Sequence, residues 1–295
     1  MILRQNAPYI PRVNVIEPSH GFMRIDFREL WECRDLLFFL AWRDISVRYK
    51  QTVLGATWIV IQPLINMVLF FFVFGKLAGL GPDSTAPYAI WSFAGQLSWQ
   101  YFERAFNNSA NSLVTNTNLL TKVYFPRLII PLSSVIPAIV DFFVSFAVFV
   151  LIMGYYMLIQ PGRIFLTWHI VFLPVFLLLA LLTALGVGLW LSALSVQFHD
   201  VPYVIPFIAR VWMFASPVIM PVSKVPAQWQ TLYALNPMVS VIEGFRWSLY
   251  TPAAFYAPQP SLFHLLGIST AMALVMIFSG TCFFKQVEKR FADVA

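Results

Sequence analysis

The sequence predicts an all-α integral membrane protein with six transmembrane helices. The chain of 295 residues is 59% hydrophobic and only 11% charged, whereas soluble domains carry about 25% charged residues. Between residues 43 and 75 a basic stretch, RDISVRYK, leads directly into a run without any Asp, Glu, Lys or Arg that ends at Lys76. A basic segment followed by a charge-free run of membrane length is typical of a cytoplasmic anchor that enters a bilayer.

The first 57 residues are expected to lie outside the membrane core. Residues 1–25 are polar, contain three prolines and lack the apolar region of a signal peptide, so we expect an irregular cytoplasmic arm. Residues 26–57 predict an amphipathic helix, because Asp26 and Glu29 resemble a capping box. Large side chains recur on one face of this helix, at Trp31, Phe38, Trp42, Ile45 and Tyr49. This pattern favours a helix on the inner leaflet over one that packs on soluble protein.

Charge-free gaps divide residues 58–286 into six expected spans. The spans lie at about 58–75, 88–102, 128–159, 168–196, 204–222 and 262–284. Since crossing the hydrocarbon core takes roughly 20 residues, the second and fifth spans are marginal. Their polar residues suggest that they face protein or water. Residues 287–295 form the expected cytoplasmic tail.

The distribution of basic residues predicts the orientation. With the N-terminus inside, the cytoplasmic segments hold 14 of the 19 Lys and Arg residues, and the outer segments hold 4. This asymmetry indicates cytoplasmic N- and C-termini. The net charge of +6 is explained first by contact with anionic membrane lipids, and it gives no reason to expect nucleic acid as a partner.

Two connecting segments have unusual compositions. The inner loop at about 107–127 is rich in Asn, Ser and Thr, which favour caps and turns; it either docks a partner protein or serves as a connector. The outer segment at 221–260 holds six prolines yet many large apolar residues, which a solvated loop does not carry. We expect two short re-entrant or capping helices at about 226–252, broken at Asn236 and Pro237.

The residue types that carry chemistry are scattered. The four histidines lie far apart, no phosphate-binding loop of the GxxxxGK[ST] type is present, and Cys33 and Cys282 lack metal-ligand spacing. Asp141 and Arg210 are charges within expected spans and are therefore functional candidates. Asp141 alternatively forms a structural hydrogen bond to a neighbouring helix. Arg210 either attracts an anionic substrate group, such as a pyrophosphate, or extends to the inner interface.

Three further patterns concern helix faces. Small residues recur every four positions in the fourth span, at Ala180, Ala184, Gly188 and Ser192, and permit a close contact within or between subunits. Glu243 and Arg246, three apart, can pair on one helix. The second span carries aromatic residues that are candidates for lining a pore, with an interfacial belt as the alternative; they are Trp91, Phe93, Trp99, Tyr101 and Phe102.

Several motifs together resemble one family. They are RDISVRYKQTVLGATWIVIQPL at 43–64, KVYFPRLIIPLSSVIPAIVDF at 122–142, FHDVPYVIPF followed by SPVIMP at 198–221, LNPMVSVIEGFRWSLY at 235–250 and the terminal FKQVEKRFADV. The chain thereby resembles, over residues 15–295, the ABC-2 type permeases that export O-antigen, capsule and teichoic-acid polysaccharides.

The resemblance implies a non-enzymatic permease of the bacterial inner membrane. It implies a homodimer that binds two copies of an ATP-binding subunit, which would hold ATP and Mg, and a channel for lipid-linked polysaccharide. The coupling residues would be Asn118, Lys122, Tyr124, Phe125 and Arg127. The outer gate would comprise Trp229, Tyr233, Asn236, Pro237, Glu243, Arg246 and Trp247. Because relatives often have a neutral polar residue near the Arg210 position, no family role is transferred to Arg210.

Other functions fit the sequence less well. A secondary transporter would need inverted repeats and an ion relay at mid-membrane, and a membrane-embedded glycan enzyme would need clustered acids or histidines. An ABC-2 exporter of a lipid or a small molecule is a further alternative.

Overall fold

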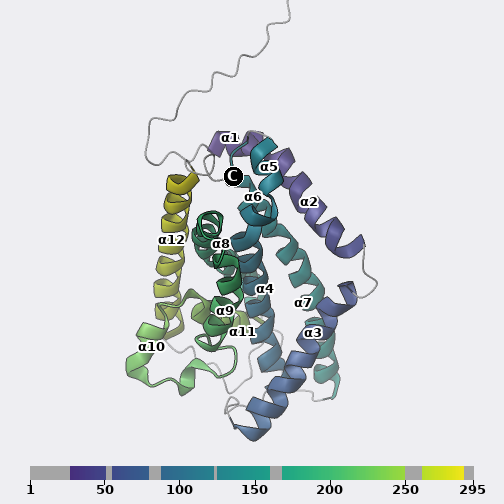
Figure 1. The fold of residues 1–295 in the computed structure, drawn as a ribbon. Helices are drawn as coiled ribbons and strands as arrows, with labels where there is room; N and C mark the ends of the chain where they lie inside the picture. The colour runs from purple at the N-terminus through teal and green to yellow at the C-terminus, as the bar shows by residue number, and fades with distance from the viewer. Residues whose placement is uncertain are drawn as a thin grey trace, which may run out of the picture.

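The structure, a computed structural model, describes residues 27–50, 55–79, 88–122, 125–159, 168–249 and 261–288. Within these ranges every regular element is helical, which confirms the all-α prediction, and the helices form a bundle (Figure 1). The expected arm at 1–25, the cap at Asp26 and the end of the expected tail lie outside the described residues.

The expected amphipathic helix is divided. α1 spans Phe27–Glu32 and α2 spans Arg34–Lys50, while α3 begins at Gly55, so residues 55–57 belong to the next helix. α2 buries Leu40 and Ala41. The expected apolar face is exposed at Trp31 on α1 and at Phe38 and Trp42 on α2, whereas Ile45 and Tyr49 are half-buried.

The first span continues beyond a regular α-helix. α3 covers Gly55–Phe70 and passes into a π-helix, η1, at Phe71–Leu77. Pro63 lies inside α3. The apolar stretch Val60–Leu77 is long enough to cross a membrane, as the sequence predicts.

The helix that holds the expected second span continues into the expected inner loop. α4 runs from Tyr88 to Thr115, so the first part of the loop expected at 107–127 is helical. The polar side chains that suggested turns bond instead to carbonyls of their own helix: Asn111 Nδ2 donates to Asn107 O at 2.9 Å, and Thr115 Oγ1 to Asn111 O at 3.0 Å. Phe106, Ala110 and Leu113 are fully buried on the same helix and anchor it in the core.

The following helices are close to expectation. α5 spans Thr117–Lys122, and the third span consists of α6 at Ile129–Ser134 and α7 at Ile136–Ile159. The fourth span combines a short 3-10 helix, η2 at Trp168–Phe172, with α8 at Leu173–Gln197. The sixth span is α12 at Ser261–Glu288.

The fifth span is shorter than predicted. α9 covers Val201–Phe214, about 21 Å at 1.5 Å per residue, whereas the prediction extended to Val222. Pro217 lies three residues after Phe214 and cannot donate the backbone hydrogen bond that a continuing helix needs. After turns, η3 at Val222–Lys224, α10 at Ala227–Tyr233 and α11 at Pro237–Leu249 complete the outer segment.

Four helical segments among the described residues are long and apolar enough to cross a membrane. They are Val60–Leu77, Ile129–Ile159, Trp168–Gln197 and Phe263–Glu288. α9 is apolar but short, and α4 is long but carries many polar residues. The count of six spans therefore stays a prediction.

The centre of the bundle is α4, which is buried along most of its length. Aromatic pairs join it to α7 through Phe93 and Phe149, and to α9 through Phe102 and Trp212. The small-residue stripe of α8 makes an intrachain contact with α4, since a Cβ atom added at Gly188 would lie 2.6 Å from Cβ of Ser109. Figure 1 shows α1 and α5 at one end of the bundle and α10 toward the other.

Candidate functional site

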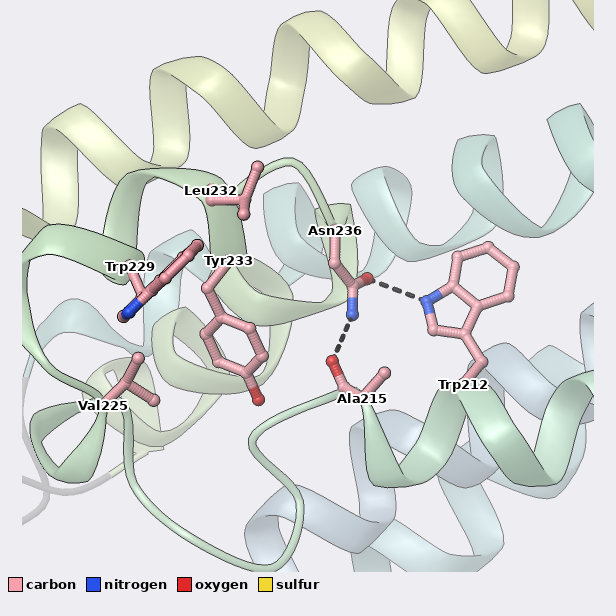
Figure 2. Close-up of a pocket in the computed structure, with 7 residues that line it drawn as sticks. All are labelled: Trp212, Ala215, Val225, Trp229, Leu232, Tyr233 and Asn236. Atoms are coloured by element: carbon pink, nitrogen blue, oxygen red, sulfur yellow. Dashed lines mark hydrogen bonds between the residues drawn. The ribbon is translucent and has the colours of Figure 1, made fainter.

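The outer hairpin of α10 and α11 turns at Asn236. Its Oδ1 accepts the backbone N–H of Met238 at 3.0 Å, and Pro237 occupies the first position of α11, which is the arrangement of an N-cap. The break at Asn236 and Pro237 is thus confirmed. Oδ1 also accepts Trp212 Nε1 at 2.8 Å, and Nδ2 donates to Ala215 O at 2.8 Å (Figure 2). One amide therefore joins the hairpin to the end of α9.

Arg246 anchors the hairpin in the core. Only 1% of Arg246 is exposed. Its guanidinium donates to the carbonyls of Trp91, Pro217 and Val218 at 2.7–3.3 Å, and its centre lies 3.5 Å from the centroid of the Trp91 ring. The predicted pair with Glu243 is confirmed at 3.1 Å. A cation at this depth is stable because each of these groups compensates its lost hydration.

A pocket of about 430 Å³ lies between the end of α9 and the hairpin (Figure 2). Its lining residues are Trp212, Ala215, Val225, Trp229, Leu232, Tyr233 and Asn236. Trp229 is exposed at the rim. The hydroxyl of Tyr233 is buried and has no hydrogen-bond partner in the described part of the chain. Burial, with a smaller contribution from Glu243, raises the pKa of Tyr233, so the phenol stays a hydrogen-bond donor.

Trp247 completes the set of expected gate residues. Its ring lies 4.0 Å from that of His169 and 5.7 Å from that of Phe172, measured between centroids. These contacts pack α11 against the start of the fourth span. The seven expected gate residues belong to this one hairpin, with Trp229 on α10 and Trp247 on α11, and their role as a gate stays a prediction.

The expected coupling residues lie at the opposite end. Asn118 is exposed on α5, and Phe125 is half-buried against a small apolar cluster. Arg127 Nη1 donates to the backbone carbonyl of Glu288 at 2.7 Å, which links this segment to the end of α12. Tyr124 and the side chain of Lys122 lie outside the described residues.

Asp141 is a paired charge. The carboxylate is 1% exposed and forms ion pairs with Arg48 and, at 3.4 Å, with Arg104. Tyr49 Oη donates to Asp141 Oδ1 at 2.9 Å. Burial and this hydrogen bond raise the pKa of Tyr49 to about 12, which keeps the phenol protonated. The expected structural hydrogen bond of Asp141 is therefore present, with arginines and a tyrosine as partners.

Arg210, the other expected intramembrane charge, is exposed on α9. Glu103 on α4 is an electrostatic neighbour of Arg210.

The five candidate channel aromatics of α4 all lie in the core of the chain. Trp91 contacts Arg246, Tyr101 packs on Phe142, and Phe93 and Phe102 are fully buried. Trp99 is 2% exposed. A role in lining a channel would require a conformation that uncovers these rings, and it stays a prediction.

Sequence reasoning expected the polar residues of the second span to face protein or water, but it missed that two buried amides there lack partners among the described residues. Gln96 and Gln100 lie one turn apart on α4, and neither amide has a hydrogen-bond partner among the described residues. It also missed the partners of Asp141. The available signal was the order of the spans, because Arg48 precedes the first expected span and Arg104 follows the second. Both therefore lie at the end of the bundle where the third expected span, which holds Asp141, starts.

Within the described ranges no group of three His, Cys, Asp or Glu residues is placed to hold a metal ion. Cys33 and Cys282 are free thiols.

Comparison with known proteins places these features in a wider group. The family described as ABC-2 type transporter matches residues 35–250. The chain is 28% identical to the O-antigen export system permease protein RfbA of Myxococcus xanthus, over 90% of this chain and 97% of the relative. It is 25% identical to the RfbA permease of Klebsiella pneumoniae, over 88% and 95% of the two chains. The polysialic acid transport protein KpsM of Escherichia coli is 22% identical, over 84% and 91%.

Proposed function

The chain belongs to the ABC-2 type transporter family, and we propose that it is the membrane subunit of an ATP-driven exporter of lipid-linked polysaccharide. The observation that carries the proposal is the extent of the match. It runs from the first turn of α2 to the end of α11, so it includes both the inner α5 segment and the outer hairpin. The similar proteins named above carry O-antigen export or polysialic acid transport in their names and match over most of their length.

The proposed topology has six spans. α4 and α9 supply the second and fifth spans beside the four long apolar helices. Both termini lie in the cytoplasm of a bacterium, and the protein resides in the inner membrane. The excess of basic residues in the inner segments supports this orientation.

The proposed assembly is a homodimer with two ATP-binding subunits. ATP and Mg would be bound by those subunits, and this chain would perform no chemistry. α5 and the following segment to Arg127 would receive the motion of the ATP-binding subunit. The exposure of Asn118 supports this segment as a docking surface. The hydrogen bond from Arg127 to the end of α12 supports its connection to the bundle.

The proposed substrate path runs beside α4. Buried amides normally have hydrogen-bond partners, whereas those of Gln96 and Gln100 have none among the described residues. If α4 is uncovered during transport, these amides can bond to glycan hydroxyls, and the aromatic residues of α4 can contact sugar rings. The hairpin of α10 and α11 would form the outer gate, since Asn236 and Arg246 connect it to both α9 and α4.

Two measurements test the proposal together. The chain, expressed with candidate ATP-binding subunits, should co-purify with one of them, and deletion of its gene should remove a surface glycan. Restoring the gene should restore the glycan. The proposal fails if no ATP-binding subunit co-purifies and the surface glycan is unchanged by the deletion.

A further inference from the structure

A groove of about 380 Å³ lies along one face of α2. All of its lining residues belong to this helix; they are Phe39, Trp42, Arg43, Ser46, Val47 and Lys50. Because they follow one another at spacings of three, one, three, one and three residues, they form a single stripe along the helix. At 1.5 Å per residue the stripe is about 17 Å long, so the groove is one continuous surface.

The opposite side of α2 is packed firmly on the bundle. α2 lies against α6, and Leu40 and Ala41 are buried there. Arg48 and Tyr49 bond to the two carboxylate oxygens of Asp141 on α7. Figure 1 shows α2 along the outside of the bundle. The groove therefore faces away from the chain and has a fixed direction.

The apolar part of the groove is exposed. Phe39 is 65% exposed, Trp42 69% and Val47 60%. Large side chains that are exposed next to one another mark a surface that contacts a partner or a membrane. An occupant of this groove must therefore carry an apolar portion that covers the two rings.

The polar part of the groove is basic. Lys50 is exposed and has no ion pair in the described part of the chain. The guanidinium of Arg43 is held by Asp44 at 2.8 Å and by Asn116 at 2.7 Å, so its charge is compensated. Ser46 adds a hydroxyl, and no Asp or Glu lines the groove. Charge complementarity at Lys50 thus favours an occupant that carries an anionic group beside its apolar portion.

The sequence places the basic end of the groove where the chain enters the membrane. Lys50 is the last charged residue before the apolar run that ends at Lys76. In the proposed topology this position lies at the level of the inner-leaflet headgroups, where the stem of a lysine runs along apolar surface and its ammonium reaches phosphates. The occupant that carries both required portions at this level is a phospholipid.

We propose that the groove of α2 is a binding site for an anionic phospholipid of the inner leaflet. The phosphate contacts Lys50 and the hydroxyl of Ser46, and the acyl portion covers Phe39, Trp42 and Val47. The inference rests on the proposed function, because that function places α2 at the inner leaflet. It requires neither glycan nor ATP, so the site can be measured separately from export.

The test is native mass spectrometry of the full chain in detergent, without lipid-linked glycan. Phosphatidylglycerol or phosphatidylcholine with identical acyl chains is added, and the retained lipid is counted. The parent should retain phosphatidylglycerol in preference. Lys50→Gln should weaken the retention of phosphatidylglycerol about fivefold, as expected for one basic residue at an anionic surface, and leave that of phosphatidylcholine unchanged. Lys50→Arg should behave as the parent.

The apolar wall has its own variant. Trp42→Ala should weaken the retention of both lipids, because their acyl chains are the same. Trp31→Ala is its matched control, since Trp31 is also 69% exposed but lies on α1, outside the groove. Arg34→Gln is the control for Lys50→Gln: it removes a positive charge from the same helix outside the groove, where Arg34 pairs with Asp35. Both controls should retain both lipids as the parent does.

Four results would overturn the lipid site. They are equal retention of the two lipids by the parent, equal losses in Lys50→Gln and Arg34→Gln, displacement of phosphatidylglycerol by added lipid-linked glycan, and loss of retention when the ATP-binding subunits are bound. The third result would assign the groove to the transported substrate, and the fourth to the partner subunit. None of them removes the proposed export function, which fails on co-purification and on the surface glycan instead.

Discussion

At the scale of single residues, Arg246 illustrates how this chain tolerates a buried cation. Its donors reach three carbonyls and one carboxylate, and an aromatic face lies against its plane. The three carbonyls come from α4 and from the turn after α9. Removal of the guanidinium would therefore leave acceptors unpaired in two elements and Glu243 without its cation.

We expect Arg246→Met to destabilise the protein by about 3–5 kcal/mol, as is usual when one partner of a buried ion pair is removed. In detergent the unfolding midpoint should fall by roughly 10 °C. Arg210→Met is the control. Because Arg210 is exposed, this substitution should change the unfolding midpoint little. Equal midpoints for the two variants would contradict the anchoring role of Arg246.

Gly95 is required by the same cluster. A Cβ atom at this position would lie 3.0 Å from Cζ of Arg246 and closer still to its Nη2, so Gly95→Ala should displace the guanidinium at a cost of about 1–3 kcal/mol. Gly154→Ala, where nothing lies within 4 Å of an added Cβ, should be neutral. Because Gly95 and Arg246 act through one contact, the two substitutions should be non-additive; additive shifts of the midpoint would refute the shared mechanism.

At the scale of elements, local patterns could be predicted and distant ones could not. The Glu243–Arg246 pair and the break before Pro237 follow from neighbouring residues. The extension of α4 through Thr115 did not follow, because Asn and Ser side chains bond to their own helix only where buried neighbours such as Phe106 hold that helix in place. The partners of Asp141 could not be identified because Arg48 is 93 residues away.

Asn236 is the element-scale test of the outer hairpin. Asn236→Ala removes the cap of α11 and the acceptor for Trp212 Nε1, a combined loss of about 2 kcal/mol. Hydrogen exchange should accelerate at the amides of α10 and of the first turn of α11, while α12 stays protected. Asn236→Asp keeps the acceptor oxygen and should exchange more slowly than the alanine variant. If hydrogen exchange in Asn236→Ala is unchanged, other contacts hold the turn between α10 and α11.

At the scale of the whole molecule, hydropathy predicts the long apolar helices, because lipid-facing segments need little sequence detail to be recognised. Hydropathy gives only a marginal signal for α4 and α9, whose places are set by packing within the bundle. The five aromatic residues of α4 show the limit most clearly: their residue types suggested a pore, while the fold of one chain places them in its core. Their function depends on movements and on a second subunit, which neither composition nor spacing specifies.

The orientation of the molecule can be measured directly. With Cys33 and Cys282 replaced by Ser, Asn118→Cys and Trp229→Cys place single exposed thiols on α5 and α10. A membrane-impermeant thiol reagent should label Trp229→Cys in cells whose outer barrier is opened, and Asn118→Cys only after the inner membrane is lysed. The reverse pattern would invert the proposed topology.

The central claim is that this chain provides the membrane path for a lipid-linked polysaccharide. The most direct measurement reconstitutes the chain with its ATP-binding subunit in vesicles and follows movement of lipid-linked glycan across the bilayer. We predict movement that requires both ATP and this chain, and that stops when ATP is replaced by a non-hydrolysable analogue. Movement that proceeds equally well without ATP, or with the ATP-binding subunit alone, would contradict the account.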